Sequence, residues 1–387
     1  MMSLMSSLKA EYAECVRLIT TDRKLQSFML CVFSMLALVI FFGFGRLGFG
    51  PAESYYLLSD RFLGGDWDYD SYGMNLPPLV IPILLLIKSL SPDYDVFCVL
   101  LSLSGFAFYM LGGHFLLKLC RETGFPEKNA FLLLLLMFLC TLTGLTTDIA
   151  TISASLIVIS MWLYRRDRIG WSFAFLALAT WAGFYPVLLF LAIFFMRLRR
   201  RELRIAATPI VAYILACLPL ILLIPHMDLS DAISLDASIG WLRDSTSYSG
   251  SAVESLLISI MWSTVLCILL SISVRREVSG IRAPVLLLLV TLFFISLWYP
   301  YSDDFFTVTV FMLFILSRMG SDAGSISTYM YASLAIYGFT ELINDFVIET
   351  GCLAYSIVSA VSLAALTVTI VLLSKEFEEL CEHPSKK

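Results

Sequence analysis

The sequence predicts an all-α, polytopic membrane protein with about twelve transmembrane helices. Of its 387 residues, 59% are hydrophobic and 15% are charged, and the mean hydropathy is +0.86. A soluble globular domain is much less apolar. Several apolar runs approach the ~20 residues that a helix needs to cross a bilayer. One segment interrupts this pattern: between Arg46 and Tyr94 the chain is acidic, aromatic and rich in Pro and Gly.

The first 26 residues precede the first apolar run and hold four cations. Apolar residues recur there at helical spacing, at positions 4, 8, 12, 16 and 19, which favours an interfacial helix on the cytoplasmic face. A disordered tail is an equally good interpretation of the same residues. No small-residue cleavage site follows the run 27–45, so we predict that this run is a retained membrane anchor.

The remaining apolar runs complete a set of twelve predicted spans, which places both termini in the cytoplasm. All but four of the 26 Lys and Arg residues then lie on the cytoplasmic side, as is typical of membrane proteins. The apolar run 77–90 would export most of the Arg clusters if it were a further span, so we predict a juxtamembrane helix there, on the outer surface. The predicted spans are 27–45, 95–117, 129–146, 149–164, 171–183, 185–196, 205–225, 254–273, 284–299, 305–317, 327–344 and 351–374.

This topology divides the chain into four regions. A cytoplasmic interfacial leader occupies 1–26, and a transmembrane module with its outer loop 46–94 occupies 27–225. A C-terminal transmembrane block at 226–374 and a cytoplasmic tail at 375–387 complete the chain. The basic run 197–204 is interpreted as a topology determinant, and no nucleic-acid partner is predicted.

The placement of charge favours an outward-facing site. Ionisable residues inside spans mark ion or proton pathways. Between residues 129 and 225 such residues fall only at span ends or between spans, and Asp148 lies at an outer end. The polar chemistry therefore gathers at the extracytoplasmic surface, which disfavours an ion pump and favours an active site facing outward.

Acidic and aromatic residues alternate in the first outer loop. If the segment 66–70, Asp-Trp-Asp-Tyr-Asp, is extended, its carboxylates lie on one face and its rings on the other. Such a face could hold a divalent cation, or bind sugar hydroxyls while the rings stack on the sugar. A solvated turn with aromatic residues anchored at the membrane interface explains any single one of these residues equally well. A divalent cation is therefore possible, but the sequence does not require one.

The same loop resembles the polyprenyl-phosphate-dependent membrane glycosyltransferases of the GT-C superfamily. The elements that carry the resemblance are Glu53 with Tyr56, a short helix ending in Gly65-Asp66-Trp67, and the stretch Pro77-Pro78-Leu79. A further match is Thr146-Thr147-Asp148, followed by an apolar span that ends in Arg165-Arg166. The resemblance covers roughly residues 27–200.

The resemblance implies transfer of a sugar from a polyprenyl-phosphate donor to an acceptor hydroxyl on the extracytoplasmic face. A carboxylate accepts the proton of the acceptor, and cations steady the departing phosphate. Glu53 is the first choice for the base, and Asp148 for a second carboxylate, with Asp66 and Asp68 as further candidates. The candidates for substrate contacts are Arg46, Tyr56, Arg61, Trp67, Lys88 and Arg243.

Two positions depart from the pattern of this family. Its members usually carry Asp at or beside the position of Ala52, and many carry Lys in the turn 180–186, where this chain has no cation. Two other functions therefore stay open. One is a carrier or flippase for a lipid or solute, with the acidic loops as gates, and the other is an inactive scaffold of a glycan assembly complex. Membrane lipids are predicted partners in every case.

Overall fold

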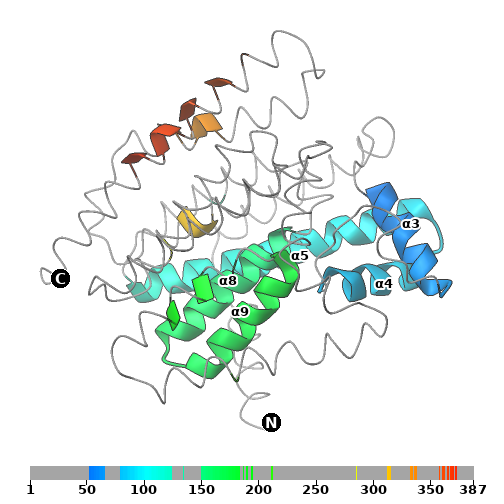
Figure 1. Cartoon of the computed structure of the whole chain (residues 1–387), viewed down its shortest axis with the longest axis horizontal. Coiled ribbons are helices and arrows are strands. Elements are labelled where there is room, and N and C mark those ends of the chain that lie inside the picture. Colours follow the sequence, from blue (N-terminus) through cyan, green and yellow to red (C-terminus); the bar gives the residue numbers. More distant parts are fainter. Residues whose placement is uncertain are drawn as a thin grey trace, which may run out of the picture. The chain divides into compact units, whose positions relative to one another are not determined.

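A computed structural model describes three stretches of the chain, residues 52–65, 79–123 and 150–183, and single helical positions or short helical pieces elsewhere. Within these residues the structure is helical and has no strand, which confirms the all-α prediction. The leader, the first predicted span and most of the C-terminal block lie outside the described residues. The helices with described bounds are α3 (Ala52–Leu63), α4 (Val80–Leu90), α5 (Tyr94–Thr123), α8 (Ala150–Arg165) and α9 (Ile169–Gly183), labelled in Figure 1.

α8 and α9 form an antiparallel hairpin. At one end Ser153 Oγ donates a hydrogen bond of 2.9 Å to the carbonyl of Ala179. Towards the other end Ser160 and Ser172 each donate to the carbonyl oxygen of the other, over 2.7 and 2.9 Å. The connecting turn contains Asp167 at φ 57°, the left-handed conformation that commonly ends a helix. Side-chain hydrogen bonds therefore fix the register of the hairpin along its length.

α5 packs along α8 in the same chain direction. Ser155 Oγ donates to the carbonyl of Phe108 over 2.6 Å, and Glu122 near the end of α5 pairs with Arg166 just beyond α8. Gly112 permits this close approach, because a Cβ added at that position would stand 2.6 Å from Ser155 Oγ. Small residues at a helix contact have this effect in membrane and soluble bundles alike.

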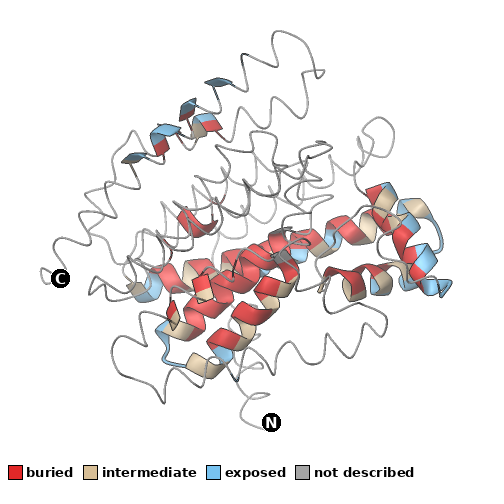
Figure 2. Ribbon diagram, in the orientation of Figure 1, coloured by how far each residue is buried: buried red, intermediate tan, exposed pale blue. Residues whose placement is uncertain are grey.

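α8 is the most enclosed of the described helices. Residues Thr151 to Leu163 are all buried, whereas α5 alternates buried and exposed positions. The ribbon of α8 is accordingly red along most of its length in Figure 2. A helix that is buried on every side belongs to the interior of a bundle. The serine hydroxyls of α8 find backbone acceptors on α5 and α9, as buried polar groups require.

α3 is amphipathic and lies against α4 and the start of α5. Its buried residues recur at helical spacing: Ala52, Tyr55, Leu58, Ser59 and Phe62. The helix ends at Gly64 and Gly65, where the Gly64 N–H bonds to the Asp60 carbonyl over 3.0 Å and Gly65 has φ 89°. Glycine at a left-handed C-terminal position is a frequent helix stop. A short helix thus ends just before Gly65, while Asp66 and Trp67 lie outside the described residues.

α4 occupies the stretch predicted to be a juxtamembrane helix, and a short turn separates it from α5. Asp93 caps α5, because its Oδ1 accepts a hydrogen bond of 2.9 Å from the Val96 N–H. Before α4, the Leu79 N–H donates to the carbonyl of Trp181 over 2.9 Å. Trp181 lies in the last turn of α9, so this bond ties the α3–α4 pair to the end of the hairpin where α8 begins.

Among the described helices, α5 is the one long and apolar enough to cross a membrane. Its 30 residues make a helix about 45 Å long, against a hydrocarbon core of ~30 Å. This is a property of length and composition, which the core helices of some soluble proteins share. α5 begins within one residue of the predicted span 95–117 and continues to Thr123, because Leu119 and Cys120 are buried and extend its packing.

Candidate functional site

Four of the predicted site residues lie within the described part of the chain. Glu53, Tyr56 and Arg61 are on α3, and Lys88 is in the last turn of α4. The other predicted residues lie outside the described residues: Arg46, Asp66, Trp67, Asp68, Asp148 and Arg243. The geometry of the candidate site therefore comes from α3, α4 and the start of α5.

Lys88 is the centre of a cluster formed by Tyr56, Asp60, Lys88, Tyr94 and Phe97, called here the Lys88 cluster. Its Nζ lies 3.0 Å from Asp60 Oδ1 and 3.4 Å from the centre of the Tyr56 ring. Tyr56 in turn makes edge-to-face contacts with Tyr94 and Phe97, both at 5.4 Å between ring centres. The side chain of Lys88 is 10% exposed, whereas that of Asp60 is 66% exposed. The ammonium is thus held against aromatic rings with its counter-ion on the solvent side.

Three neighbouring effects set the pKa of Lys88. Partial burial of the ammonium lowers this pKa, while interactions with the Tyr56 and Asp60 side chains raise it and prevail, so the pKa of Lys88 lies above its ordinary value. Lys88 therefore keeps its positive charge at neutral pH. A fixed cation beside a ring is suited to holding an anionic oxygen, such as that of a phosphate.

Glu53 is exposed in the first turn of α3, whereas the preceding residue, Ala52, is completely buried. A carboxylate near a helix N-terminus is favoured by the helix dipole. Glu53 also interacts electrostatically with Tyr94, which connects it to the Lys88 cluster. Position 52, where the resembling family usually has Asp, faces the packed side of α3 here, and the carboxylate available to solvent is the one at position 53.

Arg61 is exposed in the last turn of α3, next in sequence to Asp60. Lys88 is enclosed by aromatic rings, whereas Arg61 lies at the surface, so the two cations have different surroundings. One face of the Tyr56 ring is covered by the Lys88 ammonium. That face is not available to stack on a sugar while the cation stays in place.

The beginning of α8 shows a different kind of polar group. Thr151, three residues after the predicted carboxylate Asp148, is fully buried and its hydroxyl has no hydrogen-bond partner. An unsatisfied buried hydroxyl costs about 1–3 kcal/mol, so such groups are rare in native structures. The Ser153 to Ala179 and Leu79 to Trp181 bonds connect this end of α8 with α9 and with the segment before α4.

Three residues of the Lys88 cluster received no role from sequence reasoning: Asp60, Tyr94 and Phe97. Asp60 could have been found, because it follows Tyr56 by four residues and therefore lies on the same face of a helix. Tyr94 and Phe97 have no such signal, since their contact with Tyr56 depends on how α3 packs against α5.

Within the stretches that the structure describes, no group of three or more His, Cys, Asp and Glu side chains converges to hold a metal ion. The acidic segment 66–70, predicted as a cation or sugar site, lies outside those stretches. Comparisons of the chain with protein-family models, with curated proteins and with solved structures found no match.

Proposed function

We propose that this chain is a polytopic membrane glycosyltransferase with about twelve transmembrane helices, cytoplasmic termini and an extracytoplasmic active site. It moves a sugar from a polyprenyl-phosphate donor to an acceptor hydroxyl. Its relation to the GT-C superfamily is part of this proposal and rests on the resemblance of the first outer loop and of Thr146-Thr147-Asp148.

The observation that carries the proposal is the convergence of distant motif segments. The hydrogen bond from Leu79 to Trp181 joins the Pro-Pro-Leu stretch to the turn in which the resembling family often has Lys. The bond from Ser153 to Ala179 brings the start of α8, and hence the segment after Asp148, to the same end of the hairpin. Segments about a hundred residues apart therefore meet at one end of the helices, as a single active site requires.

The proposed chemistry is a displacement at the anomeric carbon of the donor. The acceptor oxygen forms a bond to that carbon, its proton passes to the carboxylate of Glu53, and the bond from carbon to the phosphate oxygen breaks with the electron pair leaving on phosphate. Asp148 supplies the second carboxylate, with Asp66 and Asp68 as alternatives. Lys88 is the best described candidate for the phosphate, because its charge is fixed beside Tyr56; Arg46, Arg61 and Arg243 are the further cations.

The buried polar groups favour an enzyme over an ion-coupled carrier. Among the described residues the buried polar side chains are serines and threonines, and none carries a charge. A carrier driven by ions or protons would place ionisable groups in the interior of its helices. The charged residues of α3, α4 and α8 instead lie towards helix ends or exposed faces, and α9 has none.

An inactive scaffold is the second candidate, because the family's usual Asp is Ala52 here. The burial of Ala52 and the exposure of Glu53 weigh against it. A neighbouring carboxylate already faces solvent where the base would be needed, so loss of Asp at position 52 leaves a candidate base in place.

The test is transfer of labelled sugar by the purified, reconstituted full chain from a panel of polyprenyl-phosphate sugars. Glu53→Gln and Asp148→Asn remove the two proposed carboxylates and keep their size. Asp95→Asn is the matched control, since Asp95 is an exposed carboxylate of α5 to which the proposal gives no role. Loss of a general base costs on the order of a hundredfold or more in rate.

The expected result is transfer by wild type and Asp95→Asn, with a collapse in the two site variants. Transfer that survives Glu53→Gln would move the base to another carboxylate. Failure of the wild type with every donor, together with intact folding, would contradict the enzyme and favour the carrier or the scaffold.

A further inference from the structure

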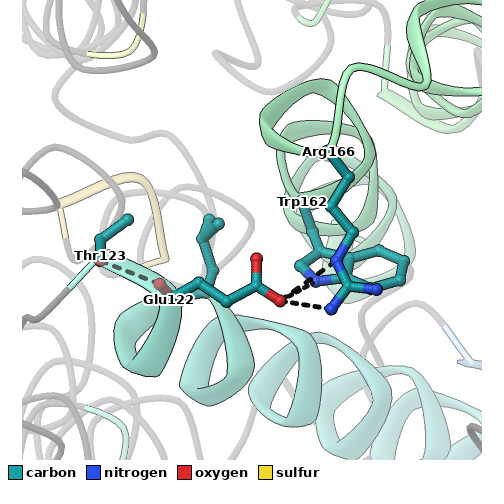
Figure 3. A network of polar contacts seen from close by, with 5 residues as sticks. Glu122, Thr123, Trp162 and Arg166 are labelled. Atoms are coloured by element: carbon teal, nitrogen blue, oxygen red, sulfur yellow. Dashed lines mark hydrogen bonds and ion pairs between the residues drawn. The ribbon is translucent and has the colours of Figure 1, made fainter.

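The opposite end of the helices, where α5 and α8 finish, carries a second polar cluster. Figure 3 shows Glu122 facing the end of α8. One oxygen, Glu122 Oε1, accepts hydrogen bonds from Trp162 Nε1 at 3.2 Å and from Arg166 Nε and a terminal nitrogen of Arg166 at 3.1 and 2.6 Å. These bonds fasten the end of α5 to the end of α8.

Two cations also lie against the indole of Trp162. The Lys118 Nζ lies 5.0 Å and the Arg166 guanidinium carbon 4.5 Å from the centre of an indole ring of Trp162. Contacts of this length are favourable cation–π interactions. Two positive groups are thus drawn to one ring beside the single carboxylate of Glu122.

The turn between α8 and α9 adds further positive charge. Because Asp167 is left-handed, the chain reverses within residues 166–168, with backbone hydrogen bonds of 3.2, 3.1 and 3.0 Å to α8. Arg165, Arg166 and Arg168 are all exposed around this turn. Trp171, one turn into α9, is 51% exposed.

The described residues at this end hold five cations and two carboxylates, Glu122 and Asp167. Cations near a helix C-terminus are favoured by the helix dipole, which accounts for one or two of them. The excess that remains is a positively charged surface, the basic patch, formed by Lys118, Arg121, Arg165, Arg166 and Arg168.

We propose that the basic patch binds the phosphate headgroups of anionic phospholipids, with Trp171 anchored among the headgroups beside it. Charge complementarity favours an anionic lipid, and an exposed Trp next to arginines is typical of the boundary between membrane and water. This inference concerns the end of the helices away from the Lys88 cluster, and it does not depend on glycosyl transfer.

The experiment is native mass spectrometry of the purified full chain in mild detergent, with equal amounts of phosphatidylglycerol and phosphatidylcholine bearing the same acyl chains. Wild type is expected to retain phosphatidylglycerol in preference, and this preference is expected to weaken as salt is raised. Each surface cation near an anionic membrane is worth about fivefold in affinity, so Arg165→Gln/Arg168→Gln should reduce the preference roughly twenty-five-fold.

Two variants separate charge at this turn from other effects. Arg165→Lys/Arg168→Lys keeps the charge and is expected to keep most of the preference. Asp95→Asn changes the net charge by one unit at the other end of α5, at an exposed residue with no proposed role, and is expected to leave the lipid preference unchanged. Circular dichroism and size-exclusion chromatography of each variant report whether it is folded.

Equal retention of the two lipids by wild type would overturn the proposal, even if the glutamine double variant did not fold. A rise in preference in Asp95→Asn as large as the loss per arginine in the double variant would also overturn it, because the effect would then follow net charge alone. Displacement of the lipid by millimolar inorganic phosphate would identify a site for soluble anions and contradict the lipid assignment.

Discussion

The α8–α9 hairpin and the α3–α4 pair are both helical, but they differ in how much of their surface is buried. α8 is buried on all sides from Thr151 to Leu163, and Ser153, Ser155 and Ser160 donate hydrogen bonds to backbone carbonyls of its neighbours. α3 and α4 bury one face only and leave charged groups, including Glu53 and Asp60, at their exposed surface. The hairpin supplies a rigid frame, and the half-exposed pair supplies groups that can react or bind.

This difference predicts where substitutions act. Changes in and around α8 should alter stability first, because close packing leaves no room for relaxation. Changes on the exposed side of α3 and α4 should leave the fold nearly intact and act on binding or chemistry. The expected effects decrease from the α5–α8 contact to the surface of the Lys88 cluster.

The largest effect on stability is expected at Gly112. A Cβ there would stand 2.6 Å from Ser155 Oγ and 3.0 Å from Met312 Cε, so Gly112→Ala should destabilise the protein by about 1–3 kcal/mol through overpacking. Thermal denaturation in detergent, followed by helical circular dichroism, measures the change.

Gly113→Ala is the matched control, because the nearest atom to its added Cβ is Leu134 Cδ1 at 3.8 Å. This variant should be neutral, or more stable by up to about 1 kcal/mol, since alanine favours helix. Equal effects of the two substitutions would show that α5 and α8 are not in close contact at Ser155.

The next effect concerns the carboxylate that joins the ends of α5 and α8. Glu122→Ala removes the acceptor of three hydrogen bonds from Trp162 and Arg166, and should cost about 1 kcal/mol, because these side chains are partly exposed. Glu122→Gln keeps an oxygen at the same position and should cost less. Both are measured by the same thermal denaturation, and a loss in Glu122→Gln equal to that in Glu122→Ala would show that the negative charge, not the acceptor atom, matters.

Two hydroxyls of α8 offer a finer comparison within the buried helix. Ser160 donates to Ser172 across the hairpin, so Ser160→Ala should lose about 0.6 kcal/mol. Thr151 has no partner, so Thr151→Val, which keeps its shape, should be neutral or stabilising. A Thr151→Val variant that transfers less sugar at an unchanged or higher melting temperature would show that the hydroxyl takes part in the reaction. A destabilised Thr151→Val would contradict the absence of a hydrogen-bond partner for this hydroxyl.

Sequence patterns were sufficient to place three of the described helices, α5, α8 and α9. Apolar runs placed α5, α8 and α9 within a few residues of their observed starts, because hydrophobic length is a local property of the chain. Glu53 and Tyr56 were proposed from the family resemblance, and Lys88 as one of the four predicted outer cations. What the pattern did not supply is their relation: the Lys88–Tyr56 contact and the Leu79–Trp181 bond join segments that only tertiary packing brings together.

The burial of Ala52 likewise could not be predicted from residue type alone. Ala52 and Glu53 are adjacent, and which of them faces solvent depends on the face that α3 turns to α4 and α5. The unpartnered hydroxyl of Thr151 is a similar case, since its neighbours in space are set by packing. Predictions of chemistry from composition therefore identify candidate groups, and packing decides which of them are accessible.

The smallest effect is expected at the surface of the Lys88 cluster, in strongly alkaline solution. The pKa of Lys88 is raised in the folded state, so its contribution to stability is complete below its unfolded pKa of about 10.4 and is lost as pH rises through the folded value. Because Asp60 is largely exposed, this contribution is at most about 1 kcal/mol.

Denaturant unfolding of wild type and Lys88→Met from pH 9 upward should give a difference in stability that shrinks above about pH 10.4. Asp60→Asn should make the loss smaller and complete at lower pH, because it lowers the folded pKa of Lys88 while the unfolded pKa is unchanged. A difference between wild type and Lys88→Met that is independent of pH would mean that Lys88 contributes through packing of its methylene chain on Tyr56 and not through its charge.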